Sequence, residues 1–273
     1  MTRHETTATP RDRRPSRERA AGSAPGDAAP GPRHGLELAL LALASALAYP
    51  VGLWLESRWL LPALNTLPAY LVMTRRLAAG ERLAAVRAML IWAGTLAVAG
   101  TLSFSLWPSD PGAVVLNGPA YREEMFGWIA TGQGSEGSPR LFLPQHLAHL
   151  TAFVVLSLAS ASALSILMGA VLMNYMDYYV ASLARAGVGP LWVALLGWQP
   201  WAICRVAAFC VLGVVLSEPL LARVGRAPRP TFRALRPWLL VAAGGILVDC
   251  LLKAWLAPAW GLALRQLLPG VRE

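Results

Sequence analysis

Long apolar runs alternate with short polar segments along this chain, and the polar segments carry nearly all of its charge. Each apolar run has about 20 residues or more, and an α-helix of that length spans roughly 30 Å of hydrocarbon. The pattern therefore predicts an all-α fold, a polytopic transmembrane helical bundle. The five runs cover residues 36–55, 85–107, 147–172, 202–221 and 237–255.

The composition agrees with a membrane protein. Hydrophobic residues make up 56% of the sequence and charged residues only 14%, whereas soluble domains carry about 25% charged residues. The formal net charge is +9, but the basic residues form no groove-like or helical patch. They cluster in the N-terminal tail and in short loops, which is the distribution that sets membrane topology. The lipid bilayer is therefore the expected partner, and nucleic acid is not.

Residues 1–35 differ from the rest of the chain. They are rich in Arg, Pro, Ala, Gly and Ser and have no periodic apolar positions. Such a segment cannot bury enough surface to offset its ordering entropy, so we predict a disordered tail, followed by a single transmembrane domain over residues 36–273. Because the tail is rich in arginine, we expect a cytoplasmic N-terminus in a multi-pass protein of a bacterial-type inner (plasma) membrane.

Arginine-rich loops predict the direction of the next helices. The segments 75–87 and 223–236 both carry an excess of arginine, so we expect both on the cytoplasmic side. The chain must return to that side through the shorter run 60–73. Pro62 and Pro68 interrupt this run, and proline removes a helix hydrogen bond, so we predict a kinked return segment.

The second half of the chain then presents a parity problem. The helix over 147–172 is predicted to continue as an amphipathic helix to Arg185 on the cytoplasmic side. Only one full-length helix lies between Arg185 and the cytoplasmic segment 223–236. Two cytoplasmic ends need an even number of crossings, so we predict that residues 191–197 dip into the membrane as a re-entrant hairpin. The buried turn of this hairpin would cover residues 197–201.

The longest polar segment, the outer loop over residues 108–146, contains most of the candidate chemistry. Residues 121–129 can form a short amphipathic helix. His146 and His149 follow at positions i and i+3, so one helix face carries both imidazoles.

Two imidazoles on one face plus a carboxylate are typical of a zinc-type site with an open position for water. The candidate metal ligands, for a divalent ion such as zinc, are therefore His146, His149 and Glu136. A second carboxylate would act as general base. The catalytic candidates are Glu123, Glu124 and His146, and Arg122 beside them is a candidate binding residue. The alternative is that these residues simply occupy a membrane interface, and the sequence leaves the cofactor unknown.

A second group of polar residues lies inside the apolar runs. Charged groups there are costly unless they are paired, so they are functional candidates. Arg205, Asp249 and Lys253 are the candidate binding residues of this group. Asp249 and Lys253 stand at i and i+4 and can pair with each other, or Arg205 can meet Asp249 from the neighbouring helix. We predict that Asp249 has one of these two basic partners.

One short stretch resembles a known family. Glu123-Glu124 followed by Phe142-x-x-x-His146 resembles the EE and FxxxH motifs of CAAX-type intramembrane proteases. Gly127 and Trp128 stand where that family has an arginine, and no membrane helix separates the two motifs. The chain is therefore not assigned to the family.

Three functions fit these observations. The leading hypothesis is a membrane-embedded hydrolase or transferase with an outward-facing Glu/His site, acting on a lipid or a membrane-borne peptide. The second is a transporter or permease that uses the intramembrane residues Arg205, Asp249 and Lys253, with a broken helix at the re-entrant turn. The third is a non-catalytic subunit with other membrane subunits as partners.

Overall fold

The structure, a computed structural model, describes residues 32–268, and within this range every regular element is helical. The predicted all-α bundle is therefore confirmed. The predicted disordered tail falls on residues 1–31, outside the described range, apart from its last few positions. The elements are α1 (Pro32–Trp54), α2 (Leu60–Ala78), α3 (Arg82–Leu106), the 3-10 turn η1 (Pro111–Ala113), α4 (Gly118–Thr131), α5 (Pro139–Ser160), α6 (Ala163–Arg185), α7 (Pro190–Leu196), α8 (Pro200–Arg223) and α9 (Phe232–Leu267).

Five of these helices, α1, α3, α5, α8 and α9, are long and apolar enough to cross a membrane. Their outward faces carry large exposed apolar side chains, such as Leu147 on α5 and Leu240 and Leu247 on α9. Soluble monomers rarely expose apolar surface of this extent. The chain is therefore a multi-pass membrane protein.

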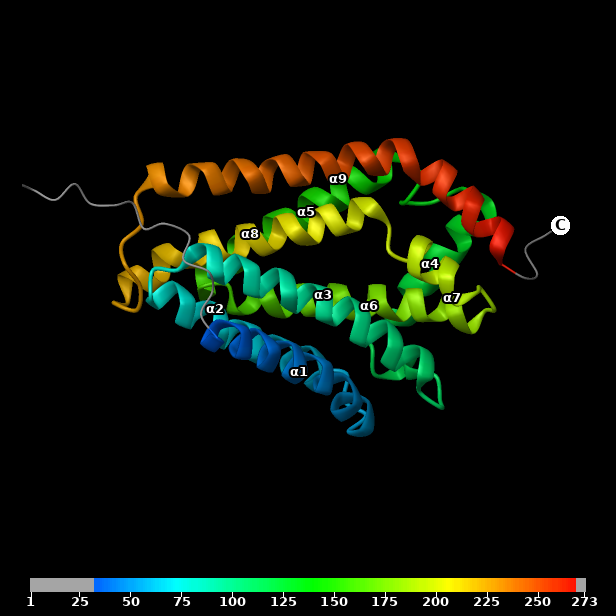
Figure 1. The fold of residues 1–273 in the computed structure, drawn as a ribbon. Coiled ribbons are helices and arrows are strands. Elements are labelled where there is room, and N and C mark those ends of the chain that lie inside the picture. Colours follow the sequence, from blue (N-terminus) through cyan, green and yellow to red (C-terminus); the bar gives the residue numbers. More distant parts are fainter. Residues whose placement is uncertain (1–31, 269–273) are drawn as a thin grey trace, which may run out of the picture.

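The long helices lie side by side along one axis, and consecutive ones run in opposite directions (Figure 1). Helix α6 is central, because it packs against α2, α3, α4 and α5. The short helices α4 and α7 lie together at one end of the bundle, which we name the loop end. The start of α1, the α2–α3 turn and the α8–α9 loop lie at the other end, which we name the basic end.

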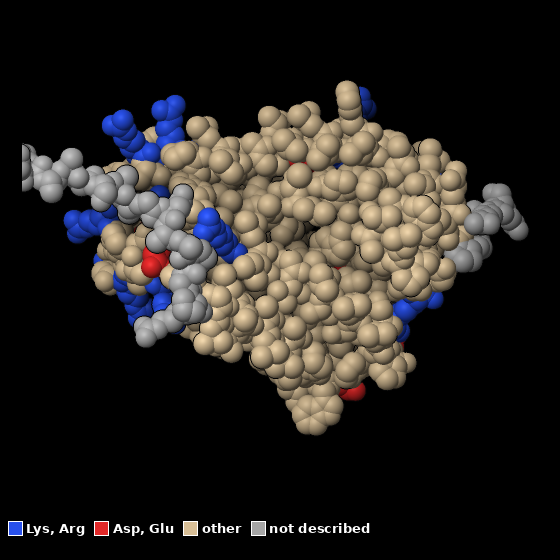
Figure 2. Space-filling view, in the orientation of Figure 1, with Lys and Arg blue, Asp and Glu red and all other residues tan. Residues whose placement is uncertain are grey.

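The two ends of the bundle differ in charge. Figure 2 shows lysine and arginine side chains gathered mainly over the basic end, whereas the band between the two ends is almost uncharged. The basic end is held together by ion pairs: Arg76 contacts Glu37 of α1, and Arg82 Nη2 of α3 lies 2.7 Å from Glu218 of α8. Glu218 is only 5% exposed, so removing Arg82 would leave a buried carboxylate without its partner.

The prediction of a single helix from residue 147 to Arg185 is wrong. The chain reverses at Ala161 and Ser162, which both adopt left-handed backbone angles, with φ of 48° and 68°. The turn is stable because serine hydroxyls satisfy its polar groups. Ser162 Oγ donates to the Gly213 carbonyl at 2.6 Å, and Ser160 Oγ accepts from the Leu164 amide at 3.0 Å.

This reversal solves the parity problem. Helix α6 supplies the extra passage along the bundle, so Arg185 ends at the loop end, where its guanidinium donates to the Phe104 carbonyl at 2.6 Å. The predicted re-entrant hairpin at residues 191–197 is therefore not needed, and the chain forms the short helix α7 (Pro190–Leu196) at the loop end instead. The turn that follows is buried, as predicted, with Gln199 1% and Trp201 0% exposed.

Two further segments are longer than expected. Helix α2 covers 19 residues and includes Pro68 in its interior, so the return segment is one continuous helix that extends beyond the predicted run. Helix α9 covers 36 residues and continues past Pro258 to Leu267. Its last part bends toward α4 and α7 (Figure 1), and proline inside a helix is a common cause of such a bend.

Candidate functional site

A cavity lies inside the bundle, between α3, α4, α5, α6, α8 and α9, with a volume of about 110 Å³. By the same measure a single water needs about 10–15 Å³, so the cavity can hold more than isolated waters. Its lining is polar toward the loop end and apolar toward the basic end. The ionisable and hydrogen-bonding side chains of the polar end include Tyr121, Glu124, Glu136, His146, His149, Tyr175, Arg205, Asp249 and Lys253.

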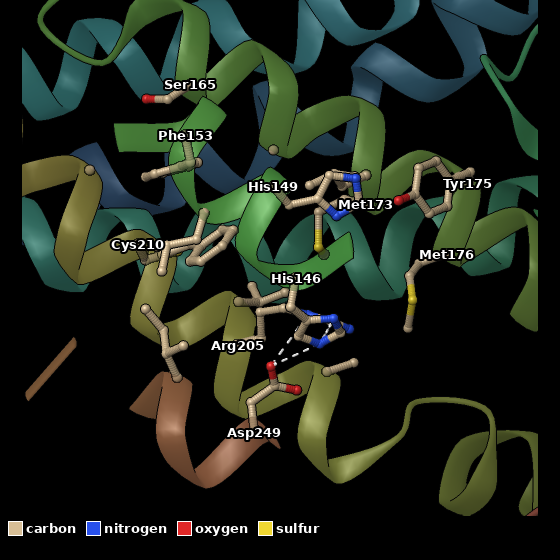
Figure 3. Close-up of a pocket in the computed structure, with 18 of the residues that line it drawn as sticks. His146, His149, Phe153, Ser165, Met173, Tyr175, Met176, Arg205, Cys210 and Asp249 are labelled. Atoms are coloured by element: carbon tan, nitrogen blue, oxygen red, sulfur yellow. Dashed lines mark hydrogen bonds and ion pairs between the residues drawn. The ribbon is translucent and has the colours of Figure 1, made fainter. Parts of the chain in front are cut away.

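Helix periodicity explains how these side chains meet. His146 and His149 are three residues apart on α5, and Asp249 and Lys253 are four apart on α9, so each pair shares a helix face. Arg205 enters from α8, which packs against both α5 and α9. Figure 3 shows Asp249 pointing toward His146 and Arg205 at this junction.

The centre of the polar end is a three-residue group on three helices. The Nε2 atom of His146 lies 2.6 Å from Nη1 of Arg205 and 3.2 Å from Oδ2 of Asp249. Arg205 Nε lies 4.0 Å from the same carboxylate oxygen. The predicted basic partner of Asp249 is therefore confirmed, and it is Arg205.

The hydrogen bonds of His146 define the tautomer of its ring. Its Nδ1 lies 3.0 Å from the Phe142 carbonyl oxygen, so Nδ1–H donates there. With that proton on Nδ1, the unprotonated Nε2 accepts from Arg205 Nη1 and leaves Asp249 without a donor.

Asp249 has unused hydrogen-bonding capacity. Its side chain is 0% exposed, and neither of its oxygens accepts a hydrogen bond from the described residues. Buried carboxylates normally accept several hydrogen bonds, and leaving them unmade costs free energy. The arrangement is therefore suited to a further donor that arrives from the cavity.

A second buried ion pair closes the polar end. Lys253 Nζ lies 2.8 Å from Glu136 Oε1, and Trp201 Nε1 donates to Glu136 Oε2 at 3.2 Å. The ammonium of Lys253 also lies 4.9 Å from the ring centroid of Phe142, within cation–π range. Glu136 and Lys253 are 6% and 2% exposed. Lys253 thus pairs with the loop carboxylate and not with Asp249.

Tyrosines form the wall of the cavity beside α4. The rings of Tyr121 and Tyr175 lie 4.5 Å apart between centroids, and Tyr121 donates to the sulfur of Met176 at 3.2 Å. Burial raises the pKa of the Tyr121 hydroxyl well above its usual value, and the nearby Glu136 carboxylate raises it further. Tyr121 therefore stays a neutral hydrogen-bonding group.

The remaining predicted residues are dispersed. Glu124 lines the cavity and accepts from the Ser135 hydroxyl, whereas Glu123 is exposed and does not line it. Arg122 points to a different place, where it donates to the Tyr178 hydroxyl at 3.3 Å and lies 4.0 Å from Asp110.

The predicted metal set is not assembled. His146 and His149 both line the cavity, but Glu136 is engaged by Lys253. Within residues 32–268, no three or more His, Cys, Asp or Glu side chains are grouped so that they could hold a metal ion. The carboxylate beside His146 is Asp249 of α9, so the two groups that sequence reasoning kept separate form one site.

Sequence reasoning missed a second buried polar cluster. Tyr49, Asn65, Asn174 and Asp177 are hydrogen-bonded to one another between α1, α2 and α6. The four side chains come from three helices, and no local sequence pattern shows that they meet.

Comparison with protein-family models, with curated proteins and with solved structures found no match to this chain.

Proposed function

We propose that this protein is a membrane-embedded hydrolase or transferase whose substrate is an amphipathic molecule of the bilayer. One observation carries the proposal: the buried Asp249 carboxylate lies beside His146 and Arg205 with unused acceptor capacity, at the end of a cavity. The rest of the cavity is largely apolar. A substrate with a polar reactive group and an apolar tail matches both parts.

The three-residue group has the parts of an acid–base site. In a hydrolysis, an attacking water gives its proton to Asp249, or to Nε2 of His146, as its oxygen bonds to the substrate's acyl or phosphoryl centre. Arg205 stabilises the negative charge that develops on the substrate oxygen. The proton then passes to the leaving oxygen as its bond breaks. In a transferase, an acceptor hydroxyl takes the place of the water.

The proposal includes an orientation. The arginine excess at the basic end favours a cytoplasmic position for that end and for the N-terminus. The polar end of the cavity then lies toward the outer leaflet of a bacterial-type inner membrane. Substrates of the outer leaflet would reach the site without crossing the bilayer.

The test is a turnover assay in vesicles of phosphatidylethanolamine and phosphatidylglycerol with radiolabelled acyl chains. Lipid products are separated by thin-layer chromatography. Asp249→Asn and His146→Ala are expected to lower turnover by at least about a hundredfold, because general acid–base groups contribute that much. Glu56→Gln is the control, since it makes the same carboxyl-to-amide change at an exposed residue of the α1–α2 turn. Undiminished turnover in both site variants would contradict the proposal.

A transporter is the second candidate, because the cavity runs along the helices and ends at the Arg205–Asp249 and Lys253–Glu136 pairs. This function predicts solute movement into sealed vesicles without any chemical change of lipid. Vesicles that show flux but no lipid product, with flux lost in Asp249→Asn, would favour the transporter over the enzyme.

A further inference from the structure

The part of the cavity that lies beyond the polar end forms an apolar arm. Its lining includes Met89, Phe153, Ile166, Phe209 and Val214. On α8 the arm runs from Arg205 to Val214, nine residues, which corresponds to about 13 Å along the helix axis. The arm is therefore long and runs parallel to the membrane-spanning helices.

Water is a poor occupant for this arm. Its few polar groups already have partners within the protein: the Ser165 hydroxyl donates to the Ser162 carbonyl at 3.1 Å and accepts from Ser157 at 2.7 Å, and the Cys210 thiol faces the Met89 carbonyl at 3.6 Å. A buried water needs two to four polar partners. An apolar occupant fits this lining better.

The arm lies within the uncharged band of the molecule. Figure 2 shows a hollow in the middle of this band, over the region where α3, α6 and α8 lie. These three helices contribute Trp92, Met173 and Phe209 to the lining. A hollow at this depth faces the hydrocarbon of the bilayer and not the aqueous phase.

We propose that the apolar arm binds one acyl chain of a membrane lipid, with the lipid's polar group beside His146, Arg205 and Asp249. The inference deepens the proposed function, on which it rests for the chemical role of the polar end, by naming an acyl lipid as the substrate class. Binding of the chain itself requires no turnover and can be measured separately.

Gly169 of α6 offers a way to block the arm. It lines the cavity, and a Cβ built there would meet only Trp92, at 3.8 Å. A leucine at this position therefore projects into open space in the arm and leaves the polar end intact. Gly94 of α3 provides a matched control, because it is exposed on the outer face and a Cβ there meets nothing within 4 Å.

The experiment uses the purified full-length protein and palmitoyl lysophosphatidylethanolamine with a photoreactive diazirine midway along its chain. Mass spectrometry maps the labelled peptides. We expect labelling of the lining segments around Phe153, Met173 and Phe209. Gly169→Leu is expected to lower this labelling at least about tenfold, because excluding even two methylene groups is worth that factor. Gly94→Leu should keep the full signal.

A second variant tests the acyl-chain site even if Gly169→Leu does not fold. The rings of Phe153 and Phe209 stack at 4.6 Å between centroids, so Phe209→Ala widens the arm. It is expected to increase labelling by a bulkier, branched-chain probe relative to the palmitoyl probe. Label only on lipid-facing residues such as Leu240, unchanged in every variant, would overturn the inference.

The outcomes separate the two proposals. Specific labelling without lipid turnover would support the acyl-chain site and contradict the proposed enzymatic activity. Turnover of acyl lipids that is unchanged in Gly169→Leu would support the proposed enzymatic activity and contradict the acyl-chain site.

Discussion

The hydroxyl of Tyr49 on α1 donates to Oδ2 of Asp177 on α6 at 2.9 Å, in the interior of the bundle. It also lies 3.0 Å from Asn174 Oδ1, which accepts from Asn65 Nδ2 at 2.9 Å. All four side chains are almost completely buried. Helix α6 therefore carries this network on one face, while its neighbouring residues Met173, Tyr175 and Met176 line the cavity on the other.

Tyr49→Phe is predicted to lower the free energy of unfolding by roughly 1–3 kcal/mol, because it leaves the buried Oδ2 atom of Asp177 without its donor and removes one of the two donors to Asn174 Oδ1. Thermal unfolding of the purified protein in detergent measures the change. Tyr70→Phe is the control, since Tyr70 lies on α2 outside this network. Equal stability of the two variants would show that the Tyr49 bonds contribute nothing.

Gly100→Ala is predicted to be more damaging. A Cβ at Gly100 would lie 2.2 Å from Asp177 Oδ2 and 2.7 Å from Cζ of Tyr49, which is closer than real contacts allow. Overpacking of this kind typically costs about 1–3 kcal/mol. Gly94→Ala on the same helix meets nothing within 4 Å and should gain about 0.5–1 kcal/mol of helix stability. Changes in the same direction for both variants would contradict the packing around Gly100.

The Glu136–Lys253 pair predicts non-additive mutations. Lys253→Met leaves the buried Glu136 carboxylate unpaired and is expected to cost roughly 3–5 kcal/mol. Glu136→Gln combined with Lys253→Met removes both charges and should recover much of that loss. A double-mutant cycle on unfolding free energies gives the coupling. Additive effects would mean that the two side chains do not interact in the folded protein.

The sequence was sufficient to predict the membrane bundle, because burial in hydrocarbon requires apolar runs of fixed length. It was not sufficient for the α5–α6 turn. Ala161 and Ser162 carry none of the glycine or proline signals that mark reversals, and the apolar run is continuous across them. The partners that stabilise the turn, such as the Gly213 carbonyl, lie far away in sequence.

The candidate site shows the same limit. Asp249 was predicted to pair with either Arg205 or Lys253, because a charged group inside a membrane is costly unless it is paired. That His146 joins Arg205 and Asp249 depends on the position of α5 beside α8 and α9, which no local pattern specifies. The i, i+4 spacing of Asp249 and Lys253 allowed these two residues to pair. Lys253 pairs with Glu136 instead, because the loop before α5 brings that carboxylate closer.

The α5–α6 turn itself makes a prediction about backbone strain. Ala161 has φ of 48°, a conformation that costs an L-residue roughly 1–2 kcal/mol and glycine little. Ala161→Gly should therefore raise the unfolding free energy. Ala163→Gly, two residues later in the first turn of α6, should lower it by about 0.5–1 kcal/mol. Destabilisation by both variants would contradict the left-handed conformation at Ala161.

The passage of α6 along the length of the bundle predicts that Gly189 and Val224 lie on opposite sides of the membrane. Single cysteines at these positions, in a variant that lacks the three native cysteines, can be labelled with a membrane-impermeant maleimide in intact cells. Gly189 tolerates a side chain, since its φ is −59° and a Cβ meets only Trp192 at 3.8 Å, and Val224 is 59% exposed. With the basic end cytoplasmic, Gly189→Cys should react in intact cells and Val224→Cys only after permeabilisation. If both cysteines reacted only after permeabilisation, residue 189 would lie on the cytoplasmic side, as a single helix from 147 to 185 requires, and the α5–α6 reversal would be wrong.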